Sequence, residues 1–343
     1  MKRAVKNQYL AAAGVVAGAL SAAVAYAFLA PAIDTSGRWR HRLTLAGKLQ
    51  IKLLRALPNK TFMTLWNRGR HMPDKAVRSV ENRPIPTRYG SVPCRIYRPF
   101  AAADELLPVY FNLHGGGFVL RGLDQDDAIC CYFASEAACV VVSVDYSVAP
   151  EHPFPRPVYE CFDVVKWVAQ HGEQLQVDGS RLAIGGYSAG GNLATAVALL
   201  NLSERAFSLQ LQVLNFAPLD HVTPTAEKNL RPGQQLLNSK NTGLFTTAYL
   251  PIIAQRSNPL ASPVLAATVE GLPPALLITA EYDLLKTDSE RYAQRLRAGG
   301  VAVAYHEFEH VDHGFTHVGP TAPALAAWQL TAHALAKAWQ EAA

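Results

Sequence analysis

Short apolar runs alternate with helical patterns from about residue 88 to the end of the chain, and this alternation constrains the fold more than any other feature. Strands are predicted at residues 109–112, 139–145, 182–185, 209–215, 275–279 and 301–308. Helices are predicted at residues 158–177, 189–202, 287–298 and 323–341. Such an order favours a mostly parallel sheet with helices on both faces. Residues 221–264 are polar and proline-rich, which predicts an insertion above the sheet.

The composition fits a folded protein. Of 343 residues, 50% are hydrophobic and 17% are charged, which excludes disordered, collagen-like and coiled-coil chains. The cysteines are odd in number and lack the spacing of metal ligands, so we expect neither a disulfide framework nor a zinc site. They are Cys94, Cys130, Cys131, Cys139 and Cys161.

Charge is distributed unevenly along the chain. Residues 1–100 hold 18 Lys and Arg against three acids, whereas the remaining residues hold 14 against 24. Nothing in the basic part resembles a recognition helix, a zinc finger or an aromatic RNA-binding strand, so no nucleic acid partner is expected. An anionic membrane surface is the expected partner instead.

Residues 7–33 form an uncharged run dominated by Ala, Val, Leu and Gly. A bilayer core needs roughly 20 apolar helical residues, so we expect residues 1–33 to be a membrane anchor. A secretory signal cleaved after Ala27 or Ala32 is the alternative, and a helix packed on a soluble domain is a third reading. More cations follow the run than precede it, which favours a cytoplasmic catalytic side without deciding it.

Residues 39–57 have the pattern of a basic amphipathic helix. Leu43, Leu49 and Leu53 recur on one face, while Lys48, Lys52 and Arg55 occupy much of the other. This helix could lie on anionic lipid, cover an apolar cleft or pack as an ordinary surface helix.

The sequence Gly-Tyr-Ser-Ala-Gly-Gly at residues 186–191 follows a predicted strand and precedes a predicted helix. This context is typical of a nucleophile elbow, in which Gly186 and Gly190 permit a sharp turn and Ser188 is exposed. The helix N-terminus would offer the backbone N–H of Ala189 to a developing anion. The alternative is a turn without chemistry.

The sequence His114-Gly115-Gly116-Gly117-Phe118 follows another predicted strand. A glycine run lets backbone N–H groups point into a site, where they could stabilise a tetrahedral oxyanion. The alternative is a flexible loop tip.

A serine nucleophile needs a base, and the base needs an acid that holds its tautomer. Asp283 follows the predicted strand at 275–279, and His313 follows the one at 301–308. The order Ser, Asp, His is typical of α/β hydrolases. Rival positions are Glu281 and Asp288 for the acid, and His310 and His317 for the base.

Taken together, these motifs resemble the hormone-sensitive lipase family of bacterial serine esterases. The resemblance covers roughly residues 90–320 and includes residues 114–118, 145–155, 186–191, 258–263, 281–283 and 313–315. It implies an α/β-hydrolase fold with an eight-stranded, mostly parallel sheet and a helical cap, and no metal or organic cofactor. It also implies that Ser188 is the nucleophile, His313 the base and Asp283 its orienting acid, with oxyanion donors at Gly116, Gly117 and Ala189.

Together with the apolar run and the basic segment that follows it, this resemblance divides the chain into residues 1–33, basic cap helices at 34–87, and a catalytic domain at 88–343 with a cap insertion at about 221–264. The expected function is that of a serine carboxylesterase or lipase acting on small esters with short to medium acyl chains through an acyl-enzyme. A non-catalytic receptor on the same fold is the alternative, and a serine peptidase is disfavoured because no large gating domain is evident. The oligomeric state is left open.

At three positions this sequence departs from the residues that are usual in the family. Tyr187 replaces a common Asp, Ser147 a common Arg, and Leu284 a common Pro. We interpret the first two as the joint loss of one ion pair.

Overall fold

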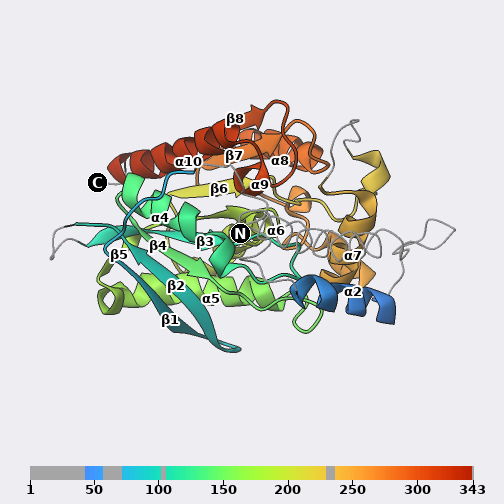
Figure 1. The fold of residues 1–343 in the computed structure, drawn as a ribbon, viewed down its shortest axis with the longest axis horizontal. Helices are drawn as coiled ribbons and strands as arrows, with labels where there is room; N and C mark the ends of the chain where they lie inside the picture. The colour runs from blue at the N-terminus through green and yellow to red at the C-terminus, as the bar shows by residue number, and fades with distance from the viewer. Residues whose placement is uncertain (1–42, 57–71, 102–105, 229–235, 342–343) are drawn as a thin grey trace, which may run out of the picture.

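The computed structural model describes residues 43–56, 72–101, 106–228 and 236–341. Within these ranges, eight strands form one sheet in the order β1-β2-β4-β3-β5-β6-β7-β8 (Figure 1). The strands are β1 (Ser79–Thr87), β2 (Gly90–Arg98), β3 (Leu107–Leu113), β4 (Val140–Val144), β5 (Val177–Tyr187), β6 (Leu211–Asn215), β7 (Ala275–Ala280) and β8 (Val303–Phe308). Strands β3 to β8 run parallel, which confirms the predicted sheet.

The antiparallel hairpin of β1 and β2 was not predicted. Its turn contains residues 87–90, so the expected domain boundary at residue 88 falls inside the sheet and β1 has to be added to the main domain. Strand β1 contains Pro84 and Pro86 and lies at the edge of the sheet. An edge strand tolerates proline because the missing N–H can face the side that has no neighbouring strand. In β2, the alternation of buried Val92, Cys94 and Ile96 is a strand signal in the sequence.

The helix predicted at 158–177 extends too far. Helix α5 (Arg156–His171) is followed by a 3-10 turn (Gly172–Leu175), and Val177 already belongs to β5. The chain approaches itself closely here, since a Cβ on Gly172 would lie 2.7 Å from the carbonyl oxygen of Val177. Gln176, with a φ of 50°, then reverses the chain direction.

Helices cover both faces of the sheet, as predicted. Residues of α5, α6 and α8 share one buried apolar core, and residues of α4 and α10 share a second one on the other side. Helix α4 was not predicted. The helices are α4 (Asp127–Glu136), α6 (Ala189–Glu204), α8 (Lys286–Ala298), α9 (Phe315–Val318) and α10 (Thr321–Glu341).

Residues 216–274 connect β6 to β7 and include the predicted insertion at 221–264. Their described residues contain α7 (Ser239–Tyr249) and three 3-10 turns. Helix α2 (Leu45–Ala56) lies beside α7 at one end of the molecule (Figure 1). The two helices touch at Gly47, where an added Cβ would lie 3.2 Å from Leu244 Cδ1.

The apolar face predicted for residues 39–57 is largely exposed on α2. Gly47, Gln50 and Ile51 are buried, whereas Leu49 and Leu53 are 48% and 43% exposed. Arg55 holds this orientation, because its side chain turns inward, donates to the carbonyl oxygens of Val119 (2.7 Å) and Ala149 (2.5 Å) and pairs with Glu151. A guanidinium held by three acceptors determines which face of the helix meets the protein.

The apolar run at 7–33 and Trp39 lie outside the described residues. In the part of the chain that the structure describes, no helix combines the length and the apolar character that crossing a bilayer requires.

Candidate active site

Ser188 stands between the end of β5 and the start of α6. Its φ of 52° and ψ of −117° are unfavourable for a residue with a Cβ, and such strain is common at functional turns. The turn is possible because Gly190 has no side chain, since a Cβ there would collide with the carbonyl oxygen of Leu113. Ala189 is the first residue of α6, so its N–H lies at the helix N-terminus.

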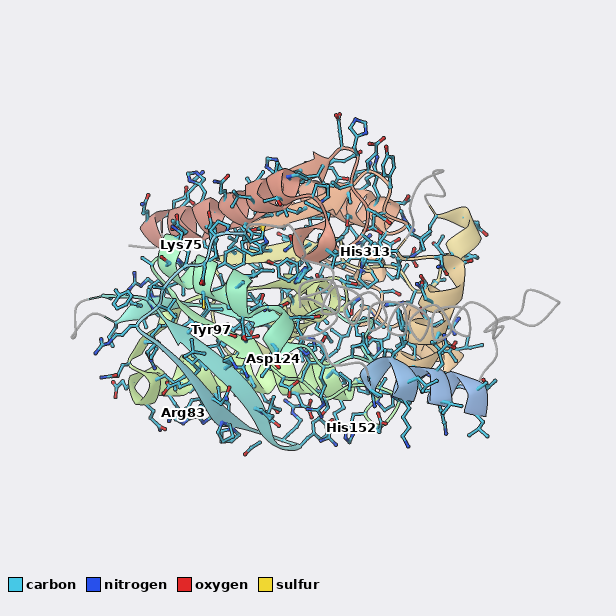
Figure 2. The ribbon with its side chains drawn as sticks, in the orientation of Figure 1. Lys75, Arg83, Tyr97, Asp124, His152 and His313 are labelled. Carbon is cyan, nitrogen blue, oxygen red and sulfur yellow. The ribbon has the colours of Figure 1, made fainter. Side chains whose placement is uncertain are left out.

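Three predicted residues form a continuous chain of hydrogen bonds. His313 Nε2 lies 3.0 Å from Ser188 Oγ, and His313 Nδ1 lies 2.8 Å from Asp283 Oδ2. Asp283 is fully buried, and its Oδ1 accepts a hydrogen bond from the N–H of Leu285 at 2.9 Å. Ser188, His313 and Asp283 therefore have the geometry of a nucleophile, a base and an orienting acid. His313, labelled in Figure 2, projects from the loop between β8 and α9.

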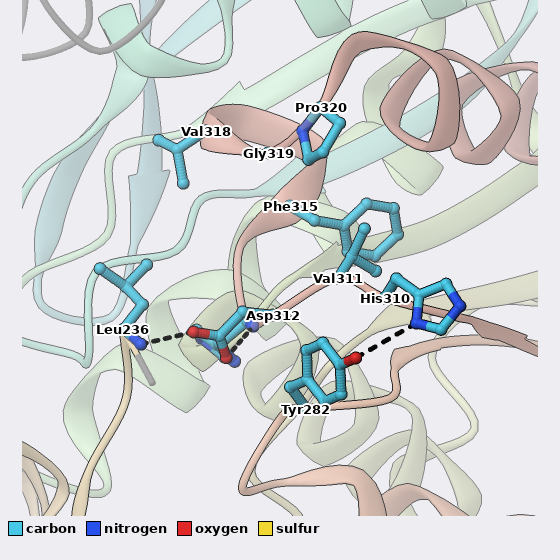
Figure 3. Close-up of a pocket in the computed structure, with 10 residues that line it drawn as sticks. Leu236, Tyr282, His310, Val311, Asp312, Phe315, Val318, Gly319 and Pro320 are labelled. Carbon is cyan, nitrogen blue, oxygen red and sulfur yellow. Dashed lines mark hydrogen bonds between the residues drawn. The ribbon is translucent and has the colours of Figure 1, made fainter. Parts of the chain in front are cut away.

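The rival residues have other partners. Asp288 Oδ2 accepts hydrogen bonds from Lys228 Nζ at 2.8 Å and from the N–H of Leu219 at 3.1 Å. Burial raises the pKa of Asp288, although the charge of Lys228 opposes this. His310 has a side chain that is 80% exposed, and its Nδ1 lies 3.1 Å from the hydroxyl of Tyr282 (Figure 3). Glu281 accepts the N–H of His310.

The glycine loop lies against the nucleophile. It follows β3, and a Cβ on Gly115 would lie 3.8 Å from Ser188 Cβ. The ring of His114 stacks on Tyr146 at 4.2 Å, and the Tyr146 hydroxyl donates to the His114 carbonyl oxygen at 2.7 Å. Burial lowers the pKa of His114, so this ring is neutral at neutral pH. Gly116 and Gly117 have φ values of 122° and 60°, which glycine adopts easily.

The insertion covers this loop. A Cβ on Gly117 would lie 2.6 Å from the ring of Phe245 in α7. Next to it, the ring of Phe118 stacks on Tyr249 at 3.8 Å. Aromatic side chains of α7 therefore form a ceiling directly above the loop, which limits the space beside it.

A cavity of about 570 Å³ opens beside His313 (Figure 3). Leu236 of the insertion and Phe315 are among its lining residues. Asp312 joins the two sides, because its carboxylate accepts the N–H of Leu236 at 2.6 Å and the N–H of His313 at 2.7 Å. The loop that carries His313 is thus attached to the insertion.

Comparison with known proteins agrees with this geometry. Residues 110–317 match a family model described as the alpha/beta hydrolase fold. The chain belongs to the hormone-sensitive lipase family of α/β hydrolases. It is 35% identical to an arylesterase of Saccharolobus solfataricus over 211 residues, which cover 61% of this chain and 68% of that protein. It is 32% identical to an ethyl acetate hydrolase of Pseudomonas putida over 238 residues, which cover 68% and 75% of the two chains.

Solved structures give the same assignment. An esterase of the archaeon Pyrobaculum calidifontis superposes with a TM-score of 0.76 at 34% identity, covering 84% of this chain and 93% of that chain. These similarities and the complete Ser188, His313 and Asp283 arrangement disfavour a non-catalytic receptor on the hydrolase fold.

The structure shows the partners of the residues that depart from the usual sequence of the hormone-sensitive lipase family. Ser147 binds Glu160 through its N–H (2.7 Å) and its hydroxyl (2.8 Å), and Arg156 supplies the positive charge beside Glu160. Tyr187 packs instead against the ring of His317 at 4.6 Å. The two positions contact different partners in this chain, and their joint replacement of one ion pair stays a prediction. Leu284 is buried.

One part of the site was missed. Asp126 is fully buried and binds Asn112 and His317, whereas the sequence suggests His317 only as a rival base. The sequence contains no motif that brings these residues together, because 191 positions separate Asp126 from His317.

Proposed function

We propose that this protein hydrolyses carboxylic esters, with Ser188 as nucleophile, His313 as general base and acid, and Asp283 as the orienting acid. The observation that carries the proposal is the unbroken sequence of hydrogen bonds from Ser188 Oγ through His313 to Asp283. Asp283 has no solvent exposure, so water does not screen its interaction with the imidazolium that forms during the reaction.

The reaction proceeds in two halves. Ser188 Oγ forms a bond to the carbonyl carbon of the ester while its proton moves to His313 Nε2. The backbone N–H groups of Gly116, Gly117 and Ala189 stabilise the oxyanion. His313 then gives the proton to the departing alcohol, which leaves an acyl-enzyme. Water attacks that ester in the same way, and the carboxylic acid is released.

Replacing Ser188 with Ala tests this assignment. Hydrolysis of p-nitrophenyl butyrate should fall by a factor of about 10⁴ or more, while circular dichroism and the melting temperature stay close to those of the parent. His313→Ala should be almost as severe. His333→Ala is the matched control, because that histidine is exposed on α10, and it should leave the rate unchanged. A Ser188→Ala variant with more than a few percent of the activity would refute the assignment.

We further propose that the enzyme prefers short to medium acyl chains. The ceiling of α7 supports this, because Phe245 lies directly on Gly117 and leaves little room beside the oxyanion donors. The name of the ethyl acetate hydrolase relative points to small esters as well.

A series of p-nitrophenyl esters from acetate to palmitate measures this preference. Phe245→Ala should move the optimum of kcat/KM toward longer chains by opening the ceiling. Phe100→Ala is the control, since Phe100 is 72% exposed and its removal should leave the profile unchanged. A parent profile with its optimum at palmitate would contradict the proposal.

Finally, we propose that the protein works at an anionic membrane surface, anchored through residues 1–33, with cleavage of this segment as an export signal as the alternative. The outer face of α2 supports attachment. Leu45, Leu49 and Leu53 are 84%, 48% and 43% exposed there, and Lys48 and Lys52 lie exposed between them. A face that interleaves leucine and lysine suits the boundary between acyl chains and acidic headgroups.

A further inference from the structure

A second carboxylate and imidazole meet close to the nucleophile. Asp126 Oδ1 lies 2.9 Å from His317 Nε2. Asp126 has no solvent exposure and the His317 side chain is 13% exposed. The triad chemistry described above does not use either residue, so their burial together calls for another explanation.

Asp126 is attached to the glycine loop at residues 114–118, called the oxyanion loop below because it carries proposed oxyanion donors. Its Oδ2 accepts a hydrogen bond from Asn112 Nδ2 at 2.7 Å, and Asn112 lies in β3 two residues before His114. The preceding residue, Gln125, donates from Nε2 to the carbonyl oxygen of Gly115 at 3.3 Å. The short segment of Gln125 and Asp126 therefore holds the start of the glycine loop at two points.

His317 is attached to the other two catalytic segments. It belongs to α9, four residues after His313, and its N–H donates to the carbonyl oxygen of Gly314 at 2.9 Å. Its ring stands edge-on to the ring of Tyr187 at 4.6 Å, and Tyr187 directly precedes Ser188. The oxyanion loop, the loop that carries His313 and the nucleophile Ser188 thus meet at the pair of Asp126 and His317.

The hydrogen bonds of Asp126 and His317 restrict how the segments that meet at this pair can move relative to one another. A buried carboxylate is costly unless donors satisfy it, so Asp126 favours only arrangements in which Asn112 and His317 point at it. Apolar packing would tolerate small sliding movements that these hydrogen bonds resist. Catalysis is sensitive to such movements, because a displacement of about 1 Å can cost a factor of about 10² in rate.

We propose that Asp126 and His317 are positioning residues that hold the oxyanion loop, the nucleophile and the general base in register. The inference rests on the proposed roles of Ser188 and His313. Neither Asp126 nor His317 exchanges a proton with the substrate in this role.

The test compares Asp126→Asn, His317→Phe and His317→Gln in the full chain, with p-nitrophenyl butyrate as substrate. Titration with a p-nitrophenyl alkylphosphonate counts reactive Ser188, so that kcat refers to correctly folded enzyme. We expect kcat to fall by about 10- to 100-fold in Asp126→Asn and in His317→Phe, with KM within threefold of the parent. His317→Phe keeps a ring beside Tyr187 but loses the donor to Asp126.

The conservative variant separates positioning from packing. His317→Gln retains an N–H donor of similar reach and should recover most of the activity that His317→Phe loses. The double variant Asp126→Asn/His317→Phe should lose little more than either single one, because both act through one hydrogen bond. Asp124→Asn, two residues away on the surface and labelled in Figure 2, is the control for the carboxylate and should keep its kcat.

An unchanged kcat per titrated serine in His317→Phe would overturn the proposal, whether or not the melting temperature falls. Equal losses in His317→Phe and His317→Gln would overturn it as well. If Asp126→Asn does not fold, the two His317 variants still decide. Failure of the proposed function is a separate outcome, since Ser188→Ala would then remain active or the phosphonate would not label Ser188.

Discussion

At the scale of single residues, two carboxylates five residues apart, one before α8 and one in its first turn, have different tasks. Asp283 orients His313, whereas Asp288 binds Lys228 and backbone N–H groups. Asp283→Asn should lower kcat by a factor of about 10³ to 10⁴, because the amide favours the wrong imidazole tautomer. Asp288→Asn should keep the kcat per active site and lower the melting temperature. Steady-state kinetics with active-site titration checks both, and the reverse pattern would identify Asp288 as the acid.

His221 should make stability depend on pH. Its Nε2 atom is buried without a hydrogen-bond partner among the described residues, and burial, assisted by Lys228, lowers the pKa of the ring to about 3. The unfolded chain, with a pKa near 6.5, binds the proton first as the pH falls. The contribution of the neutral His221 ring to the free energy of unfolding is therefore complete above pH 6.5 and is lost as the pH falls from 6.5 to about 3.

Between pH 6.5 and 4.5 this loss should reach at most about 2 to 3 kcal/mol of unfolding free energy. Denaturant titrations of the parent and of His221→Gln at both pH values measure it, and the variant should show the smaller change. Parallel pH profiles for the two proteins would contradict the assignment.

At the scale of elements, a buried ion pair attaches the insertion to α8. The side chains of Lys228 and Asp288 are only 4% and 1% exposed. Lys228→Met should lower the unfolding free energy by about 3 kcal/mol, because it leaves the Asp288 carboxylate without its cation. Adding Asp288→Asn should cost less than the sum of the two single changes, with a coupling of about 1 to 3 kcal/mol in a double-mutant cycle. Lys337→Met removes an exposed pair and should cost less than about 1 kcal/mol. Additive effects would show that the pair does not anchor the insertion.

At the scale of the whole molecule, the N-terminal part could attach the protein to a membrane in two ways, through the apolar run at 7–33 or through the basic helix α2. The full-length protein should sediment with membranes and resist extraction by high salt, because burial of some 20 apolar residues is insensitive to ionic strength. Protein beginning at Asp34 should bind vesicles containing phosphatidylglycerol through α2, and this binding should weaken as salt screens Lys48 and Lys52. Vesicle flotation at two salt concentrations measures it.

Leu45→Gln/Leu49→Gln/Leu53→Gln is the matched variant of the truncated protein and should lose the remaining binding while hydrolysing soluble esters normally. Full-length protein found in the soluble fraction with a new N-terminus after Ala27 or Ala32 would instead indicate a cleaved export signal. Uncleaved soluble protein would contradict membrane attachment.

Much of the fold and the catalytic chain could be predicted because their signals are local. A strand followed by a glycine-flanked serine and a helix specifies its own geometry, since only glycine fits where Gly190 meets Leu113. Ser188, Asp283 and His313 follow the parallel strands β5, β7 and β8, which places them at one edge of the sheet. The hairpin of β1 and β2 was missed although its signal is present in β2, because prolines in β1 mask the pattern.

The remaining features depend on contacts between distant parts of the chain. Periodicity alone places Leu49 and Leu53 on one apolar face of α2 without deciding what that face meets, whereas Arg55 finds acceptors 64 and 94 positions away and leaves that face exposed. Likewise, Asp126 and His317 carry no motif. The sequence by itself therefore determined the parallel part of the sheet and the three residues proposed for the reaction, whose backbone geometry is encoded within a few neighbours. Only the tertiary structure decided which helix face is free and which buried charges meet, because a polar group is satisfied by whatever partner the fold brings to it.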